Sequence, residues 1–180
     1  MNGLYLIKPT SIASTGSGNS SSISANGSVT FSSCATLSLN GVFNADYDNY
    51  MIVCRNLNTT EGNSNLFRLR ASGTDASGSN YVDQYIYASS TSVFAARTTL
   101  TNGGIGFTST NRQGYTLYVF GPYLAQPTAF RSVCGSGYAT ATVIDRAGTH
   151  SLSTSYDGIT LLYGGGDSES GLIGVYGMVK

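Results

Sequence analysis

The chain has 180 residues and no net charge, because nine basic side chains balance nine acidic ones, and charged residues make up only 10 % of it. A charge this low and this balanced excludes the basic surface that nucleic-acid-binding proteins need, and the length suits one domain. No apolar run is long enough to span a membrane or to form a secretory signal peptide, so we expect synthesis in the cytoplasm and no membrane partner.

The composition favours short strands and tight loops over helices. The chain contains 23 glycines and is rich in serine, threonine and asparagine, whose side chains hydrogen-bond to the backbone in turns and compete with helix formation. Uncharged polar groups must therefore keep the surface soluble. A net charge near zero also weakens the repulsion between copies, which favours self-association.

The first 22 residues are predicted to form an arm and a linker outside the main domain. Pro9 ends a short apolar run and biases the residue before it toward extended geometry, and residues 11–22 resemble a flexible Gly/Ser linker. We therefore divide the chain into an arm with its linker (1–22) and a sandwich domain (23–180). The apolar residues of the arm, which are costly to leave in water and are therefore predicted to attach it to another surface, are Leu4, Tyr5, Leu6 and Ile7. The alternative is that these four residues form an edge strand of the protein's own sheet.

From Ile23 onward, short apolar or alternating runs recur at the spacing that is typical of β-sandwiches, with glycine, asparagine, aspartate or serine between them. No helical periodicity competes with them. The sequence therefore predicts an all-β, jelly-roll-like antiparallel β-sandwich. The expected strands are 29–32, 36–39, 50–57, 66–71, 81–88, 92–99, 104–108, 115–120, 129–134, 141–145, 149–154, 158–163 and 172–179.

Three of these runs differ in how their apolar residues are arranged. In the run 66–71, apolar residues occupy one face and two arginines the other, which indicates one buried and one exposed face. The runs 50–54 and 115–120 are apolar on both faces, which indicates central strands that are covered on each side. In a domain of this size, we expect the second cover to be another subunit.

The sequence contains no convincing catalytic site. His150 is the only histidine, and its surroundings read as a turn that enters a strand rather than a nucleophile elbow. Cys34, Cys54 and Cys134 lack CxxC spacing and are expected to be buried free thiols, with one disulfide and an odd thiol as the alternative. We therefore expect no enzyme activity and no cofactor.

Calcium is the one metal for which suitable oxygen ligands cluster in the sequence. The clusters are Asp46, Asp48 and Asn49, and Asp167 with Glu169. Neither has the spacing of an EF-hand loop, so the preferred interpretation is a pair of turns capped by these side chains. The three glycines at 164–166 are expected at the tip of a β-hairpin, because the carboxylates that follow would repel a phosphate.

Tyrosine is the one unusual enrichment, with 13 residues and no tryptophan in the chain. Tyr81, Tyr85 and Tyr87 fall at odd positions of one predicted strand and therefore share a face. Tyrosine buries a ring while its hydroxyl can still hydrogen-bond, which suits interfaces and sugar-binding platforms. We assign these three residues to a subunit interface, with an ordinary core and a glycan platform as alternatives.

Four segments resemble small virion proteins of tailed bacteriophages. They are LSLNGVFNADYDNYMIV (37–53), LFRLRASGT (66–74), YDGITLLY (156–163) and the closing GLIGVYGMVK (171–180). The resemblance implies a virion protein with a jelly-roll-like fold that is often trimeric. In that group such domains occur as tail-fibre or tail-tip modules and as capsid decorations, and this chain lacks the long stem of a full tail fibre.

The leading hypothesis from the sequence is a capsid decoration protein on the virion surface. It would form a homotrimer and attach through its N-terminal arm to other virion proteins, such as the major capsid or tail proteins. The alternative is a tail-fibre or tail-tip protein that recognises host surface glycan through tyrosine and asparagine loops. The enzyme-class alternative is a depolymerase that acts on the same glycan.

Overall fold

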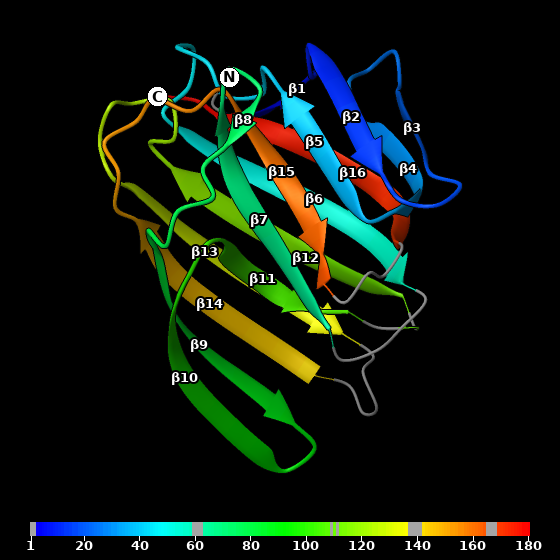
Figure 1. Cartoon of the computed structure of the whole chain (residues 1–180), viewed down its shortest axis with the longest axis vertical. Helices are drawn as coiled ribbons and strands as arrows, with labels where there is room; N and C mark the ends of the chain where they lie inside the picture. Colours follow the sequence, from blue (N-terminus) through cyan, green and yellow to red (C-terminus); the bar gives the residue numbers. More distant parts are fainter. Residues whose placement is uncertain (1–2, 59–62, 109, 111, 137–141, 165–168) are drawn as a thin grey trace.

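The protein consists of two antiparallel β-sheets packed face to face (Figure 1). The computed structural model describes residues 3–58, 63–108, 110, 112–136, 142–164 and 169–180. The predicted antiparallel β-sandwich is therefore confirmed. Among the described segments, no helix is long and apolar enough to cross a membrane.

The larger sheet contains ten strands. In spatial order they are β10 (Ser92–Leu100), β9 (Tyr81–Ser89), β14 (Thr142–His150), β13 (Thr128–Ser136), β12 (Gln113–Phe120), β6 (Asn49–Asn58), β16 (Glu169–Met178), β4 (Val29–Cys34) and β3 (Ser20–Ile23), with β1 (Leu4–Ile7) also paired to β16. β1 and β4 bond to opposite ends of the long strand β16, β1 along Val175–Met178 and β4 along Glu169–Ile173.

The smaller sheet contains six strands and covers part of the larger one. In spatial order they are β11 (Gly103–Phe107), β7 (Ser64–Ala71), β15 (Gly158–Tyr163), β5 (Thr36–Asn40) and β2 (Ser11–Thr15), with β8 (Thr74–Asp75) also paired to β7. Its edge strand β11 lies over β13 and β14. The β9–β10 hairpin therefore extends beyond the cover, and Figure 1 shows it at the lower end of the molecule.

The core lies between the two sheets and follows from the alternation in the strands. Leu37, Ile52, Phe67, Leu117 and Ile159 are completely buried there. The predicted central strands are confirmed, because β6 and β12 lie side by side in the middle of the larger sheet. Each of them buries one apolar face under the smaller sheet and turns its other face away from it.

Glycines in β11 allow the two sheets to approach closely beside the hairpin. A Cβ atom on Gly104 would collide with the Arg146 side chain, and one on Gly106 would collide with Cys134. Since only glycine avoids these collisions, the sequence of β11 fixes where the smaller sheet ends over β14.

The structure corrects the predicted arm and linker at residues 1–22. This segment contributes three strands to the sandwich, with β1 paired to β16, β2 to β5 and β3 to β4. Its serines and threonines suit a strand here because their hydroxyls pair across neighbouring chain segments, as Ser14 does with Ser21 and Thr15 with Thr36. The edge-strand alternative describes residues 4–7 correctly.

The structure also joins two predicted strands, 141–145 and 149–154, into the single strand β14. The sequence predicts a turn at Gly148, but this residue lies within the strand. A Cβ atom there would collide with the Val82 carbonyl and the Phe130 ring. The strand ends at His150, after which Ser151 donates a backbone hydrogen bond to Asn80. Residue 141 lies outside the described residues.

Candidate interaction surface

The most extensive uncovered surface is the side of the larger sheet that faces away from the smaller one, which we call the outer face. Strand alternation places there the residues that lie between the core positions, for example Val53 beside the buried Ile52 and Cys54, and Val133 beside the buried Cys134. At about 3.3 Å per residue along a strand and about 4.8 Å between strands, the ten strands would give a sheet face of roughly 1,200 Å².

The outer face is apolar over much of its extent. Large hydrophobic side chains that are at least 39 % exposed on it are Leu4, Val53, Leu57, Ile86, Val93, Phe120, Val133, Val143 and Leu172. They come from eight of the ten strands, so the apolar character runs across the sheet. Exposed apolar side chains that recur on neighbouring strands of one face indicate an interaction site.

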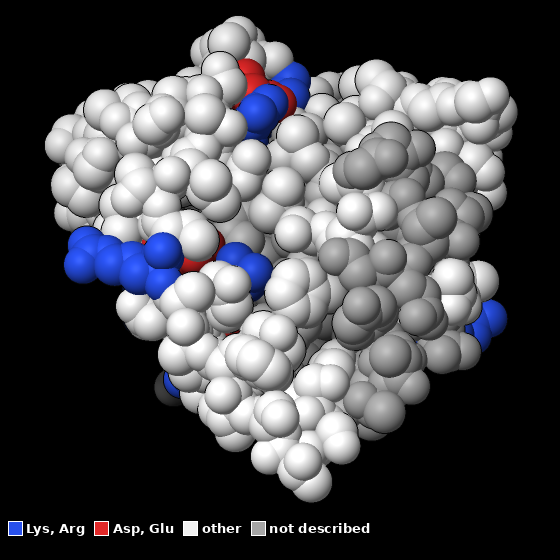
Figure 2. All heavy atoms as spheres, turned by 60° about the horizontal axis from the view of Figure 1, so that its bottom comes forward, with Lys and Arg blue, Asp and Glu red and all other residues white. Residues whose placement is uncertain are grey.

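Charged groups on the outer face are few. Among the described strand residues they are Arg55, Arg97, Arg131 and Asp145. Arg131 and Asp145 form an exposed ion pair with Nη2 and Oδ2 2.6 Å apart, and the carboxylate raises the pKa of the guanidinium above its ordinary value. Figure 2 shows that charged side chains are sparse in a second view of the molecule as well.

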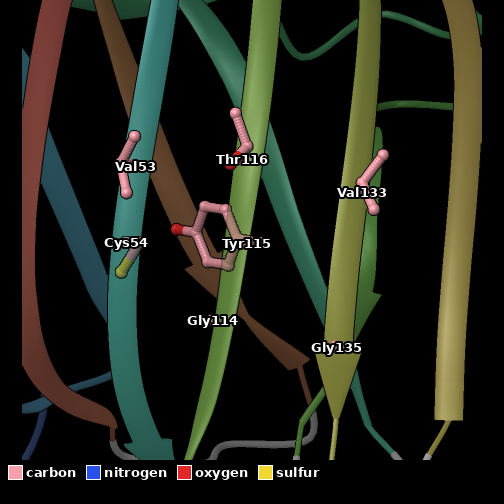
Figure 3. A pocket seen from close by; sticks show the side chains of 7 residues that line it. All are labelled: Val53, Cys54, Gly114, Tyr115, Thr116, Val133 and Gly135. Carbon is pink, nitrogen blue, oxygen red and sulfur yellow. The ribbon is translucent and has the colours of Figure 1, made fainter.

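Shallow depressions mark the outer face where glycine replaces a larger side chain. The one in Figure 3 has a volume of about 380 Å³ and lies between Val53, Thr116 and Val133, at Gly114 and Gly135. Val53 also borders a depression near Leu172, and Val133 borders another near Phe120. These hollows are open and joined through shared apolar rims, so they suit protein side chains better than an enclosed small molecule.

The β9–β10 hairpin carries an aromatic stack on its inner side. Tyr87 stacks on Phe94 with ring centroids 4.7 Å apart, and Tyr85 stacks on Tyr87 at 6.4 Å. Phe107 of β11 meets the Tyr87 ring edge-on at 5.5 Å. Phe94 remains 48 % exposed, because the smaller sheet ends before it reaches β10.

The three predicted tyrosines lie on one face of β9, but they have different surroundings. Tyr81 is 1 % exposed, and its hydroxyl donates to the Ala76 carbonyl and accepts from the Leu69 amide. It therefore belongs to the core. Tyr85 and Tyr87 are partly exposed in the hairpin stack, which keeps them available for an interface.

A buried ion pair anchors the hairpin to the sandwich. Asp83 of β9 accepts hydrogen bonds from Thr98 of β10 at 2.6 Å and from the Gly104 amide of β11 at 3.0 Å. Its carboxylate also lies 3.5 Å from Arg146 of β14, whose guanidinium sits over the Tyr85 ring at 4.2 Å from the centroid. Four strands thus meet at one carboxylate, which fixes the root of the hairpin.

The predicted attachment residues split between the two sides of β1. Their register on β16 places Leu4 and Leu6 on the outer face beside Met178 and Tyr176, and Ile7 in the core. Tyr5 points inward and stacks on Tyr47 at 6.3 Å. None of the four belongs to a free arm, and Leu4 is part of the outer face defined above.

His150 and the cysteines are core residues. His150 is completely buried between the rings of Tyr81 and Tyr156, and burial lowers the pKa of its imidazole. Cys34, Cys54 and Cys134 are unpaired and buried, and burial raises the pKa of Cys134 to about 12. Groups this inaccessible cannot act on a dissolved substrate.

The two oxygen-rich clusters that were considered for calcium make other contacts. Asn44 accepts a hydrogen bond from the Asp46 amide, and Asp48 pairs with Lys180 at 3.0 Å. Glu169 is completely buried and accepts hydrogen bonds from the side chains of Asn56 and Gln113. Asp167 lies outside the described residues. No group of three histidine, cysteine, aspartate or glutamate side chains within the described part of the chain is placed to hold a metal.

Sequence reasoning missed the Asp83–Arg146 pair and the exposure of β10. The two charged residues lie 63 positions apart, so no local spacing links them. The run 92–99 was predicted as a strand, but its edge position depends on the crossover that brings β14 beside β9. Only the alternation within β9 and β10, which determines which side chains share a face of the hairpin, could be predicted.

Comparisons with known proteins leave the family open. No family model and no curated protein matches the sequence. Among solved structures, the chain is similar to domain 4 of AbnA, a GH43 extracellular arabinanase from Geobacillus stearothermophilus, determined in complex with arabinotriose. That similarity has a TM-score of 0.38 with 9 % sequence identity, over 94 % of this chain and 83 % of that one.

Proposed function

We propose that this protein is a non-enzymatic structural component of a bacteriophage particle, which associates with copies of itself and with neighbouring virion proteins. The observation that carries the proposal is the apolar outer face of the larger sheet. Its estimated area of roughly 1,200 Å² exceeds the about 800 Å² per partner that a stable protein interface buries. Uncharged association surfaces of this kind suit permanent assembly.

The virion setting rests on the resemblance of four sequence segments to tailed-bacteriophage proteins. The resemblance favours a surface location, as a capsid decoration or in the tail. Because residues 4–7 are docked on β16, attachment would use the folded surface that includes Leu4 rather than an extended arm.

Quantitative gel densitometry of purified particles tests the location. Hundreds of copies per particle are the expected result for a capsid decoration protein, and a few to some tens would place the protein in the tail. Absence from purified particles would contradict the virion proposal. It would leave the self-association proposal to be judged separately, from the mass of the isolated protein.

A second candidate function is recognition of a host surface glycan by the hairpin. The observation that favours it is the partly exposed stack of Tyr85, Tyr87 and Phe94, because aromatic rings can stack on the apolar faces of sugars. Binding of purified protein to host polysaccharide, lost on Tyr87→Ala and kept on Tyr118→Ala of the outer face, would support it. The absence of new reducing ends would separate binding from cleavage.

A further inference from the structure

The larger sheet ends in an unusually unprotected edge strand. β10 is nine residues long and pairs with β9 along its whole length, and no other strand in the described part of the chain pairs with its free side, which leaves backbone groups there without a strand partner. At the opposite edge of the sheet, β3 and β1 are each only four residues long. The two edges of the larger sheet therefore differ in the length of strand that they leave unpaired.

β10 lacks the features that usually block edge-to-edge pairing. Proteins protect edges with proline, with inward-pointing charge, with bulges or with short strands. The sequence SVFAARTTL has no proline and one charged residue, Arg97, and the described register with β9 is continuous. Val93 is 72 % exposed on the outer side and Phe94 is 48 % exposed on the inner side, so both faces of the strand end in uncovered apolar groups.

Contacts within the protein already hold the β9–β10 hairpin in place before any partner binds. The Phe94–Tyr87 stack and the hydrogen bond from Thr98 to Asp83 hold β10 to β9, and the Asp83–Arg146 pair holds β9 to β14. An edge that is already rigid loses little conformational entropy when it pairs. This favours a main-chain partner over a role as a mobile loop.

We propose that β10 pairs antiparallel with β10 of a second copy, across a two-fold axis, so that the two larger sheets form one continuous sheet. The proposal rests on the self-association proposed above and names the partner and the strand. A second copy fits because the same strand supplies complementary backbone groups to itself, and a two-fold contact closes without forming a fibre. A glycan would leave the backbone groups of the edge unpaired.

The sequence of β10 and its pairing with β9 also predict the register of the contact between the two copies. Ser89 and Ser92 close a two-residue hairpin turn, so residues 93, 95 and 97 direct their backbone groups toward the free edge. With Ala95 opposite Ala95 of the second copy, Phe94 lies opposite the small Ala96. Val93 of one copy lies opposite Arg97 of the other. The two Arg97 side chains therefore do not face each other, which avoids a like-charge pair.

Cysteine cross-linking tests the pairing and its register. The three native thiols are buried, so a cysteine introduced by Val93→Cys, Ala95→Cys or Arg97→Cys is the accessible one, and Ser22→Cys on β3 is the matched control. We expect oxidation to give disulfide-linked dimers mainly with Ala95→Cys. Equal yields from all four variants, or none from Ala95→Cys, would overturn the pairing. A maximum at residue 93 or 97 would overturn the register.

Ala95→Pro separates this contact from association through the outer face. Proline there removes an amide that points to the free edge and spares the hydrogen bonds to β9, so we expect a folded protein whose dissociation constant rises at least tenfold. Dissociation by Val53→Lys but not by Ala95→Pro would overturn edge pairing and leave self-association standing. A wild-type protein of three chains, or of one chain, would also overturn edge pairing. Of these two results, only the single chain would contradict the proposed function. Glycan binding by a monomer through Tyr87 would assign the hairpin to recognition instead.

Discussion

At the scale of single residues, two ion pairs of the same kind differ in their surroundings. Asp83 and Arg146 are buried, with side chains 2 % and 5 % exposed, whereas Asp145 and Arg131 face solvent on the outer face. Removing one partner of a buried pair leaves an uncompensated charge, while an exposed pair contributes little.

We therefore predict that Asp83→Ala lowers the free energy of unfolding by about 3–5 kcal/mol. Asp145→Ala is the control and is expected to cost less than about 1 kcal/mol. Urea unfolding followed by circular dichroism measures both. Equal losses for the two variants would show that the hairpin root is not held by the buried pair.

His150 gives the protein a specific sensitivity to acid. Burial lowers the pKa of its imidazole below the ordinary value of 6.5, so the unfolded chain binds a proton more readily than the folded protein does. Stability is therefore fully present above about pH 6.5 and declines as the pH falls below that value.

The expected result is that the melting temperature of the wild type falls between pH 7 and pH 5 by more than that of His150→Phe. Phenylalanine keeps the edge-to-face contacts with Tyr81 and Tyr156 and has no group to protonate. Thermal unfolding at several pH values provides the comparison. Identical pH profiles for the two proteins would remove His150 from the explanation.

At the scale of elements, β1 decides between two interpretations of the N-terminus. It pairs with β16 over four residues, and Ile7 is buried in the core. Burying one isoleucine contributes about 1.5–3 kcal/mol, and in a protein of this size 1 kcal/mol shifts the melting temperature by roughly 2–4 °C.

Deletion of residues 1–10 is consequently predicted to lower the melting temperature by about 3 °C or more. Deletion of residues 1–3 keeps β1 and serves as the control, which should melt like the full chain. Differential scanning calorimetry measures the difference. An unchanged melting temperature after the longer deletion would restore the interpretation of this segment as a free arm.

The strands from residue 29 onward could be predicted because alternation and turn residues are local properties. The strands within residues 11–23 could not, because a Ser/Thr-rich edge strand has the composition of a linker, and only its partners β5 and β4 distinguish the two.

Gly148 was misleading for a similar reason: glycine marks a turn unless a neighbouring chain approaches closely. Tyr81, Tyr85 and Tyr87 were placed correctly on one face, but the edge of the smaller sheet separates the core member from the exposed pair.

At the scale of the whole molecule, the unequal size of the two sheets explains the candidate surfaces. Six strands cannot cover ten, so the hairpin extends past the smaller sheet, and the two sheets form only two layers in the described part of the chain, so nothing there covers the outer face. The proposed self-association would supply a cover for the outward apolar residues of β6 and β12, which are visible in the sequence.

The mass of the purified protein in solution tests this account most directly. Light scattering at micromolar concentration is predicted to give a multiple of the 18.8 kDa chain. The double variant Val53→Lys/Val133→Lys is predicted to lower this mass, because it places charge at the centre of the outer face and so weakens association through that face. Leu152→Lys, at an exposed residue outside both sheets, is the control and should leave the mass unchanged. A wild-type protein that remains a monomer of 18.8 kDa would contradict the account.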